Sequence, residues 1–282
     1  MPTPDPQALR SVPLTGPLWT AMLGPSGPPL PSRSRERLVA IAPLADCTGD
    51  ATPLPALQRA CVAVPLLLAE AITLETEHVG QALVATHGSS GLSAFREPMP
   101  LTSALTLASP ATPPRQLVTG HFSRDVTGAL QLELQLHALV GGAAPVGLRA
   151  SRGTPGELAA RVERELLGAL GRAQTPPLPR APSDDVALAV AHEVLVLTLL
   201  ARGKLDGAQA WGGAETVDRA LAWAKATPAA ATPVLHALAA HQAATLTGRP
   251  TAPAVRTALL ERLAATPSLS SWAKALPAGA VP

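Results

Sequence analysis

Histidines are the side chains of this chain that could most readily supply metal ligands or transfer protons, and their spacing decides which of them can act together. His236 and His241 are five residues apart, which on a helix turns their side chains about 140° from each other. Two ligands on one helix face need a spacing of three or four residues. His121 and His137 fall on the polar face of a predicted hairpin, but the predicted turn places His121 opposite Leu132, roughly 17 Å along the strand from His137. We therefore expect no metal site.

Two short segments contain part of a catalytic or phosphate-binding motif, and each lacks a required residue. Residues 87–92 read HGSSGL, whereas a nucleophile elbow, G-x-S-x-G, requires glycine where Leu92 stands. A phosphate loop ending at Gly203–Lys204 requires glycine in place of Thr198 and serine or threonine in place of Leu205. The first segment is interpreted as a turn and the second as a helix end. We expect no catalytic residue and no cofactor.

The charge distribution bears on nucleic-acid and membrane partners. The formal net charge is +2, from 22 basic and 20 acidic residues spread along the chain. Such a balance leaves no broad basic surface for nucleic acid or for an anionic membrane. Arg33, Arg35 and Arg37 form one local basic run beside serines, and such runs more often serve solubility than phosphate binding. We expect neither kind of partner.

Cysteine usage and the chain's apolar stretches bear on its compartment. Cys47 and Cys61 have no second pair, so they fit neither a zinc knuckle nor a disulfide framework and are predicted to be core residues in a reducing compartment. Residues 1–10 contain three prolines and lead into no apolar run of the signal-peptide type. The most apolar stretch, 186–201, contains His192–Glu193 and is shorter than the roughly 20 residues that span a bilayer. We expect a cytoplasmic protein without a membrane span.

The elements that must position these side chains begin with a proline-rich arm, residues 1–36. Its nine prolines predict extended or irregular structure, with one short apolar turn over residues 14–23. Residues 37–173 then predict an α+β domain with a mixed or antiparallel sheet and packed helices. Its expected strands are 38–42, 79–86, 115–124, 130–139 and 146–148, and its expected helices 57–71, 101–107 and 154–172.

The hairpin and the helix that follows it carry the clearest local signals. Over residues 130–137 one face of the strand holds only leucines and the other only polar residues, so we expect one buried and one solvated face. Thr154 and Glu157 have the spacing of a capping box, with Pro155 at the first helical position. The leucine face comprises Leu130, Leu132, Leu134 and Leu136, and the polar face Gln131, Glu133, Gln135 and His137.

Four prolines in 174–183 predict a stiff linker, and residues 184–282 after it predict an all-α domain of helical hairpins. Two short similarities, AKATP with LAATP and ARGK with LTGR, indicate a weak internal repeat of one hairpin type. The expected helices are 183–202, 215–226, 234–246, 254–265 and 269–276.

Two segments carry a resemblance to a known family. They read RLVAIAPLADCTGD at 37–50 and RQLVTGHFSRDVTGALQLELQL at 115–136. With the order of elements around them, they resemble the amino-terminal α/β domain of TolB-like proteins and the related CsgG-like domains. The helices from 183 onward resemble degenerate tetratricopeptide repeats, which often accompany such a domain in bacterial regulators. The resemblance implies a non-catalytic binding or regulatory module.

The leading functional hypothesis is a cytoplasmic adaptor or regulatory protein that binds a protein or peptide partner through its helical half. Of the tryptophans in that half, Trp223 and Trp272 are expected in the core. Trp211 stands in a glycine-flanked loop and is the predicted partner-binding residue, because tryptophan is enriched at binding hot spots.

Two alternatives remain open. One is an enzyme with an unfamiliar site at the domain junction that uses some of His78, His87 and His121. The other is a DNA-associated protein that uses the segment 33–37, which would require its arginines to lie beside others on one face.

Overall fold

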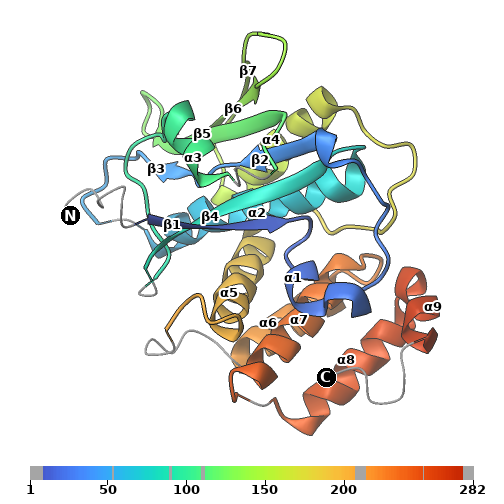
Figure 1. Cartoon of the computed structure of the whole chain (residues 1–282). Helices are drawn as coiled ribbons and strands as arrows, with labels where there is room; N and C mark the ends of the chain where they lie inside the picture. Colours follow the sequence, from blue (N-terminus) through green and yellow to red (C-terminus); the bar gives the residue numbers. More distant parts are fainter. Residues whose placement is uncertain are drawn as a thin grey trace. The chain divides into compact units, whose positions relative to one another are not determined.

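The computed structural model describes residues 9–52, 54–88, 91–108, 112–206, 214–249 and 251–275. Their contacts divide the chain into two units (Figure 1). Unit 1 falls within residues 1–17, 32–175 and 183–189, and unit 2 within residues 18–31, 176–182 and 190–282. Both the predicted arm and the predicted linker thus contribute residues to both units.

Unit 1 is built on a mixed sheet of seven described strands in the order β1-β4-β2-β5-β6-β7, with β3 beside β5. The strand β2 is parallel to both β4 and β5, whereas β1 with β4 and the run β5, β6, β7 are antiparallel. The predicted mixed sheet with packed helices is confirmed. The strands are β1 (Leu9–Thr15), β2 (Leu38–Ile41), β3 (Ala45–Asp46), β4 (Val79–His87), β5 (Gln116–Arg124), β6 (Leu130–Ala138) and β7 (Val146–Ser151).

One face of this sheet is covered by the helices α2 (Pro55–Glu75) and α4 (Pro155–Leu170), which also pack against each other (Figure 1). A Cβ atom on Gly80 of β4 would lie 2.3 Å from the carbonyl oxygen of Ala69, so only glycine permits this approach of strand and helix. Thr73 secures it, because its hydroxyl accepts from the Gly80 amide at 2.9 Å and donates to the Ala69 carbonyl at 2.8 Å.

The helix α2 is the one described helix long and apolar enough to cross a membrane by length and composition. Its most apolar stretch is 83% buried inside the protein. The core helix of a folded domain can have the same length and composition as a membrane-spanning helix. Its packing against the sheet and against α4 accounts for its apolar character.

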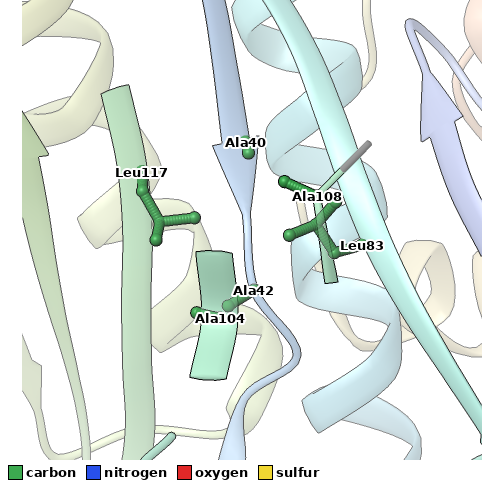
Figure 2. Close-up of a cluster of buried hydrophobic side chains, with 6 residues drawn as sticks. All are labelled: Ala40, Ala42, Leu83, Ala104, Ala108 and Leu117. Carbon is green, nitrogen blue, oxygen red and sulfur yellow. The ribbon is translucent and has the colours of Figure 1, made fainter. Parts of the chain in front are cut away.

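The opposite face of the sheet carries the short helix α3 (Leu101–Leu107). Small side chains on β2 let α3 come close to the sheet, and larger ones on the neighbouring strands fill the space beside them (Figure 2). The buried cluster comprises Ala40, Ala42, Leu83, Ala104, Ala108 and Leu117. Because α3 has only seven residues, it covers only part of this face.

The predicted hairpin is present, with its register shifted by one residue from the prediction. His121 lies opposite Glu133, not Leu132. The reason is the turn, which takes the five residues 125–129 because the Asp125 carboxylate accepts from the Ala129 amide at 3.0 Å. His121 and His137 are therefore four pairs apart on the ladder, roughly 14 Å along the strands.

Leu132, Leu134 and Leu136 of β6 are buried as predicted, and α4 packs on this strand. Leu130 is only partly buried, and Gln131 on the polar face is buried rather than solvated. The capping box that starts α4 is confirmed: the Thr154 hydroxyl accepts from the Glu157 amide at 3.3 Å, and the Glu157 carboxylate accepts from the Thr154 amide at 3.0 Å. The buried stripe of α4 includes Leu158, Val162 and Leu166.

Unit 2 contains the helices predicted from the periodicity of the second half. The helix α5 crosses the division between the units at residues 189 and 190, and Gly203, with φ of 62°, ends it as predicted. Within unit 2, α6 packs against α7, α7 against α8, and α8 against α9. The helices are α5 (Asp185–Ala201), α6 (Ala214–Ala226), α7 (Thr232–Leu246), α8 (Pro253–Ala265) and α9 (Pro267–Ala275).

The described part of the proline-rich arm contains a strand and an α-helix, besides the short 3-10 turn Gly24–Ser26 and the start of another, Arg35–Arg37. The strand β1 pairs with β4 at the sheet edge, a place where proline is tolerated, and Pro13 lies inside it. The predicted apolar turn is the helix α1 (Thr20–Leu23), which packs against α7. Trp19, just before α1, is fully buried.

Candidate functional site

A pocket of about 600 Å³ lies over the polar face of β5, β6 and β7. This volume is in the range typical of small-molecule sites. The segment 98–101, which leads into α3, forms the opposite wall with proline, methionine and leucine side chains. The pocket therefore has an apolar wall and a polar floor.

The floor follows from the alternation of residues along the three strands. Since α4 covers the leucine face of β6 and α3 has only seven residues, the polar side chains of β5, β6 and β7 are left to line the pocket. They are Thr119 and His121 from β5, Glu133, Gln135 and His137 from β6, and Arg149 from β7.

Glu133 is the centre of a hydrogen-bonded network on this floor. Its carboxylate lies 3.2 Å from the Arg149 guanidinium and 3.9 Å from the His121 imidazole. The Gln131 side chain donates to Glu133 at 3.1 Å and to Ser123 at 2.7 Å, and it accepts from Arg149. The one carboxylate of the floor is thus compensated from within the protein.

His137 lies at the other end of the floor. Its Nε2 atom is 3.0 Å from the Thr119 hydroxyl, and burial lowers the pKa of His137, so the ring is neutral at pH 7. A neutral imidazole beside a hydroxyl is the pair that nucleophilic catalysis requires, together with a group that orients the imidazole. In the described part of the chain no carboxylate hydrogen-bonds to His137.

Gln135 and Gly147 face each other across β6 and β7 in the middle of the floor. The Gln135 side chain is exposed and makes no hydrogen bond within the described residues. A Cβ atom on Gly147 would meet no atom within 4 Å, so open space lies above it. This part of the floor is the part open to a ligand.

The comparison with protein-family models found no match, and neither did those with curated proteins and solved structures.

The histidines of the enzyme hypothesis are not brought together. His78 precedes β4 and His87 ends it, so they lie roughly 30 Å apart at opposite ends of one strand. Only His121 lines the pocket. Of the arginines in 33–37, Arg33 points into the fold and donates to the His78 carbonyl at 3.0 Å.

The predicted partner-binding residue, Trp211, lies outside the described residues, as do Ser89 and Ser90 of the incomplete nucleophile elbow. Trp223 is buried in the core as expected, with its ring centroid 5.7 Å from that of His236. Trp272 is only partly buried, and its indole donates to the Ser26 carbonyl at 3.1 Å.

The two cysteines differ in exposure. Cys61 is buried as predicted, whereas Cys47 is partly exposed, so its assignment to the core was wrong. Burial raises the pKa of both thiols, and the neighbouring Asp46 carboxylate raises both further. Both therefore stay protonated, which is the opposite of what a nucleophilic cysteine needs.

Asp46 and the loop after it form a second polar cluster, in which each charged group has a partner. The Asp46 carboxylate accepts from Thr48 at 2.6 Å and pairs with Arg96 at 3.4 Å. Asp50 pairs with Arg124 at 2.9 Å, which holds the pKa of Asp50 below its ordinary value. These contacts fix the loop. Among the described residues, no group of three histidine, cysteine or acidic side chains is placed to hold a metal ion.

Proposed function

We propose that this chain is a non-catalytic binding protein, in which the pocket of unit 1 holds a small ligand and the helices of unit 2 bind a protein or peptide partner. The pocket carries the proposal: it has the size of a ligand site, an apolar wall and a polar floor. On that floor Glu133 is bonded to Arg149, and Thr119 to His137. Such an arrangement suits recognition, since its groups keep their positions without the ligand.

The electrostatics favour binding over catalysis. A catalytic acid, base or nucleophile needs a pKa matched to its task, usually with a partner that orients it. Here Glu133 is neutralised by Arg149, and both thiols have raised pKa values. These groups stabilise one another and leave no activated nucleophile among them.

The adaptor or regulatory role rests on the helical half and on the resemblance described above. A TolB-like α/β domain followed by tetratricopeptide-like hairpins would combine a rigid platform with a partner-binding surface, in a cytoplasmic regulator. The helices α6 and α7, joined by a short connection and packed on each other, support the hairpin part of this proposal. The fold alone does not fix the function.

The partner-binding part is tested with Trp211→Ala. We expect this substitution to leave the melting temperature nearly unchanged and to weaken capture of the native partner by about tenfold, the scale of an aromatic anchor. Capture from native lysate by the two proteins, followed by quantitative mass spectrometry, measures the difference.

Trp223→Ala is the matched control, because Trp223 is buried. It should unfold or strongly destabilise unit 2, by roughly 3 to 5 kcal/mol. If Trp211→Ala lowers the melting temperature as much as Trp223→Ala does, Trp211 belongs to the core and the partner site lies elsewhere.

A hydrolytic function is the second candidate, and the 3.0 Å contact of Thr119 with His137 favours it. Thr119 would attack the ester carbonyl carbon while His137 accepts its proton, and the bond from that carbon to the alcohol or phenol oxygen would break. Water would then hydrolyse the acyl group from Thr119 and restore the hydroxyl. The wild type, Thr119→Val and His137→Asn are compared in hydrolysis of p-nitrophenyl esters. Turnover that both substitutions abolish, in proteins with unchanged melting temperatures, would support the enzyme and contradict the non-catalytic proposal.

A further inference from the structure

We infer that the pocket of unit 1 selects a small, uncharged ligand that carries a carboxamide or lactam group next to an apolar ring. This inference rests on the proposed function, in that it takes the pocket to be a binding site. It names the chemistry of the ligand from three properties of the lining.

The first property is the contrast between the two sides. Pro98, Met99, Pro100 and Leu101 offer an apolar wall, while β5, β6 and β7 offer polar side chains. A ligand between them contacts carbon atoms on one side and hydrogen-bonding groups on the other. An apolar ring with one polar substituent meets both requirements.

The second property is charge. The titratable groups that line the pocket are His121, Glu133, His137 and Arg149. Glu133 and Arg149 pair with each other at 3.2 Å, His121 lies 3.9 Å from Glu133, and His137 is neutral at pH 7 because burial lowers its pKa. A charged ligand would find no uncompensated opposite charge among these groups, so a neutral ligand is favoured.

The third property is the open middle of the floor. Gln135 carries a carboxamide, one donor group and one acceptor group side by side, with no hydrogen-bond partner among the described residues. Gly147, its neighbour across the ladder, leaves the space above it empty. A ligand amide placed there can donate to and accept from Gln135 at once, and neither a carboxylate nor an amidinium can do both.

Three ring compounds of nearly equal shape test the inference: benzamide is neutral, benzoate is an anion, and benzamidine is a cation at pH 7.5. Binding to the full chain is followed by protein-observed NMR, with the side-chain amide of Gln135 as the local probe. We expect benzamide to bind at least about fivefold more tightly than either ion, a difference of about 1 kcal/mol. The Gln135 amide signal should shift on binding.

Two glycine substitutions test whether benzamide binds in the pocket or elsewhere on the protein. Gly147→Leu fills the open space and should weaken benzamide binding at least about tenfold. The backbone at residue 147 is extended, so it accepts any side chain without strain. Gly168→Leu is the control, since Gly168 is exposed on α4, away from the pocket lining, and a Cβ atom there meets nothing within 4 Å. It should leave binding unchanged.

If benzoate or benzamidine binds most tightly and Gly147→Leu blocks it, the pocket is a binding site but the inferred ligand class is wrong. If none of the three shifts signals of the pocket residues, both the inference and the small-ligand part of the proposed function fail. Capture of a partner that depends on Trp211 does not involve these probes, so it tests the adaptor part separately.

Discussion

The two faces of β6 have opposite roles. Leu132, Leu134 and Leu136 are buried beneath α4, although Leu134 also borders the pocket, whereas the side chains of Glu133, Gln135 and His137 form its floor. The first face is fixed by packing against a whole helix, and little there can vary without a cavity or a clash. The second face is held by hydrogen bonds within the sheet, and Gln135 on it stays open to a ligand. One strand thus provides stability on one side and recognition on the other.

Two glycines show the same contrast. Gly120 of β5 lies opposite Leu134, and a Cβ atom there would come within 2.4 Å of both the Glu133 carbonyl oxygen and the Leu134 side chain. Gly147 of β7 lies opposite Gln135 and has open space above it. On the buried face glycine is required by packing. On the pocket face, glycine at position 147 leaves space for a ligand above the strand.

The largest effect is expected for Leu134→Ala, which should lower the free energy of unfolding by roughly 2 to 5 kcal/mol because truncation leaves a cavity under α4. Gln135→Ala, one residue further on, should change it by less than about 0.5 kcal/mol, as a surface substitution does. Urea unfolding followed by circular dichroism measures both. Equal losses would mean that the two faces of β6 do not differ as described.

A smaller difference is expected between the two glycines. Gly120→Ala should cost roughly 1 to 3 kcal/mol, because the added methyl group forces the strands apart. Gly147→Ala should stay within about 0.5 kcal/mol of the wild type. The same unfolding measurement compares them. A stable Gly120→Ala protein would show that the sheet relaxes there at little cost.

The sequence predicts most elements of unit 1 well because these have strong local signals. The alternation of residues 130–137 identifies the two faces of β6, and Thr154 with Glu157 identifies the start of α4. The strand β1 could not be predicted, because its pairing with β4 is non-local and Pro13 disrupts the strand signal. The register was missed by one residue, because it depends on several hydrogen bonds that Asp125 makes with Thr127, Gly128 and Ala129 in the turn.

Only one side of the pocket could be predicted from the sequence. Its floor follows from the polar residues of β6, which alternation places on one face. Its other wall, residues 98–101, has no periodicity that links it to the hairpin, and only the folded chain brings the two together. Arg149 was missed for a similar reason: the edge strand was predicted to end at residue 148, whereas β7 runs to Ser151.

The smallest expected effect is a dependence of stability on pH that comes from the pocket face. Because burial lowers the pKa of His137 in the folded protein, the unfolded chain takes up the proton first as the pH falls below about 6.5. The folded state is therefore favoured fully above that pH and loses stability as the pH falls toward the lowered pKa. Urea midpoints at pH 7.5 and 5.5 measure this loss.

His137→Gln should make the loss between these two pH values smaller, because glutamine keeps a polar group on the floor and does not titrate. Part of the loss should remain, since burial and the nearby Arg37 and Arg33 lower the pKa of His78 as well. His78→Gln should therefore reduce it in the same direction, by an independent amount, because His78 does not line the pocket. If His137→Gln leaves the pH dependence unchanged, His137 is as well solvated in the folded protein as in the unfolded chain, and the pocket face is wetter than its network of hydrogen bonds implies.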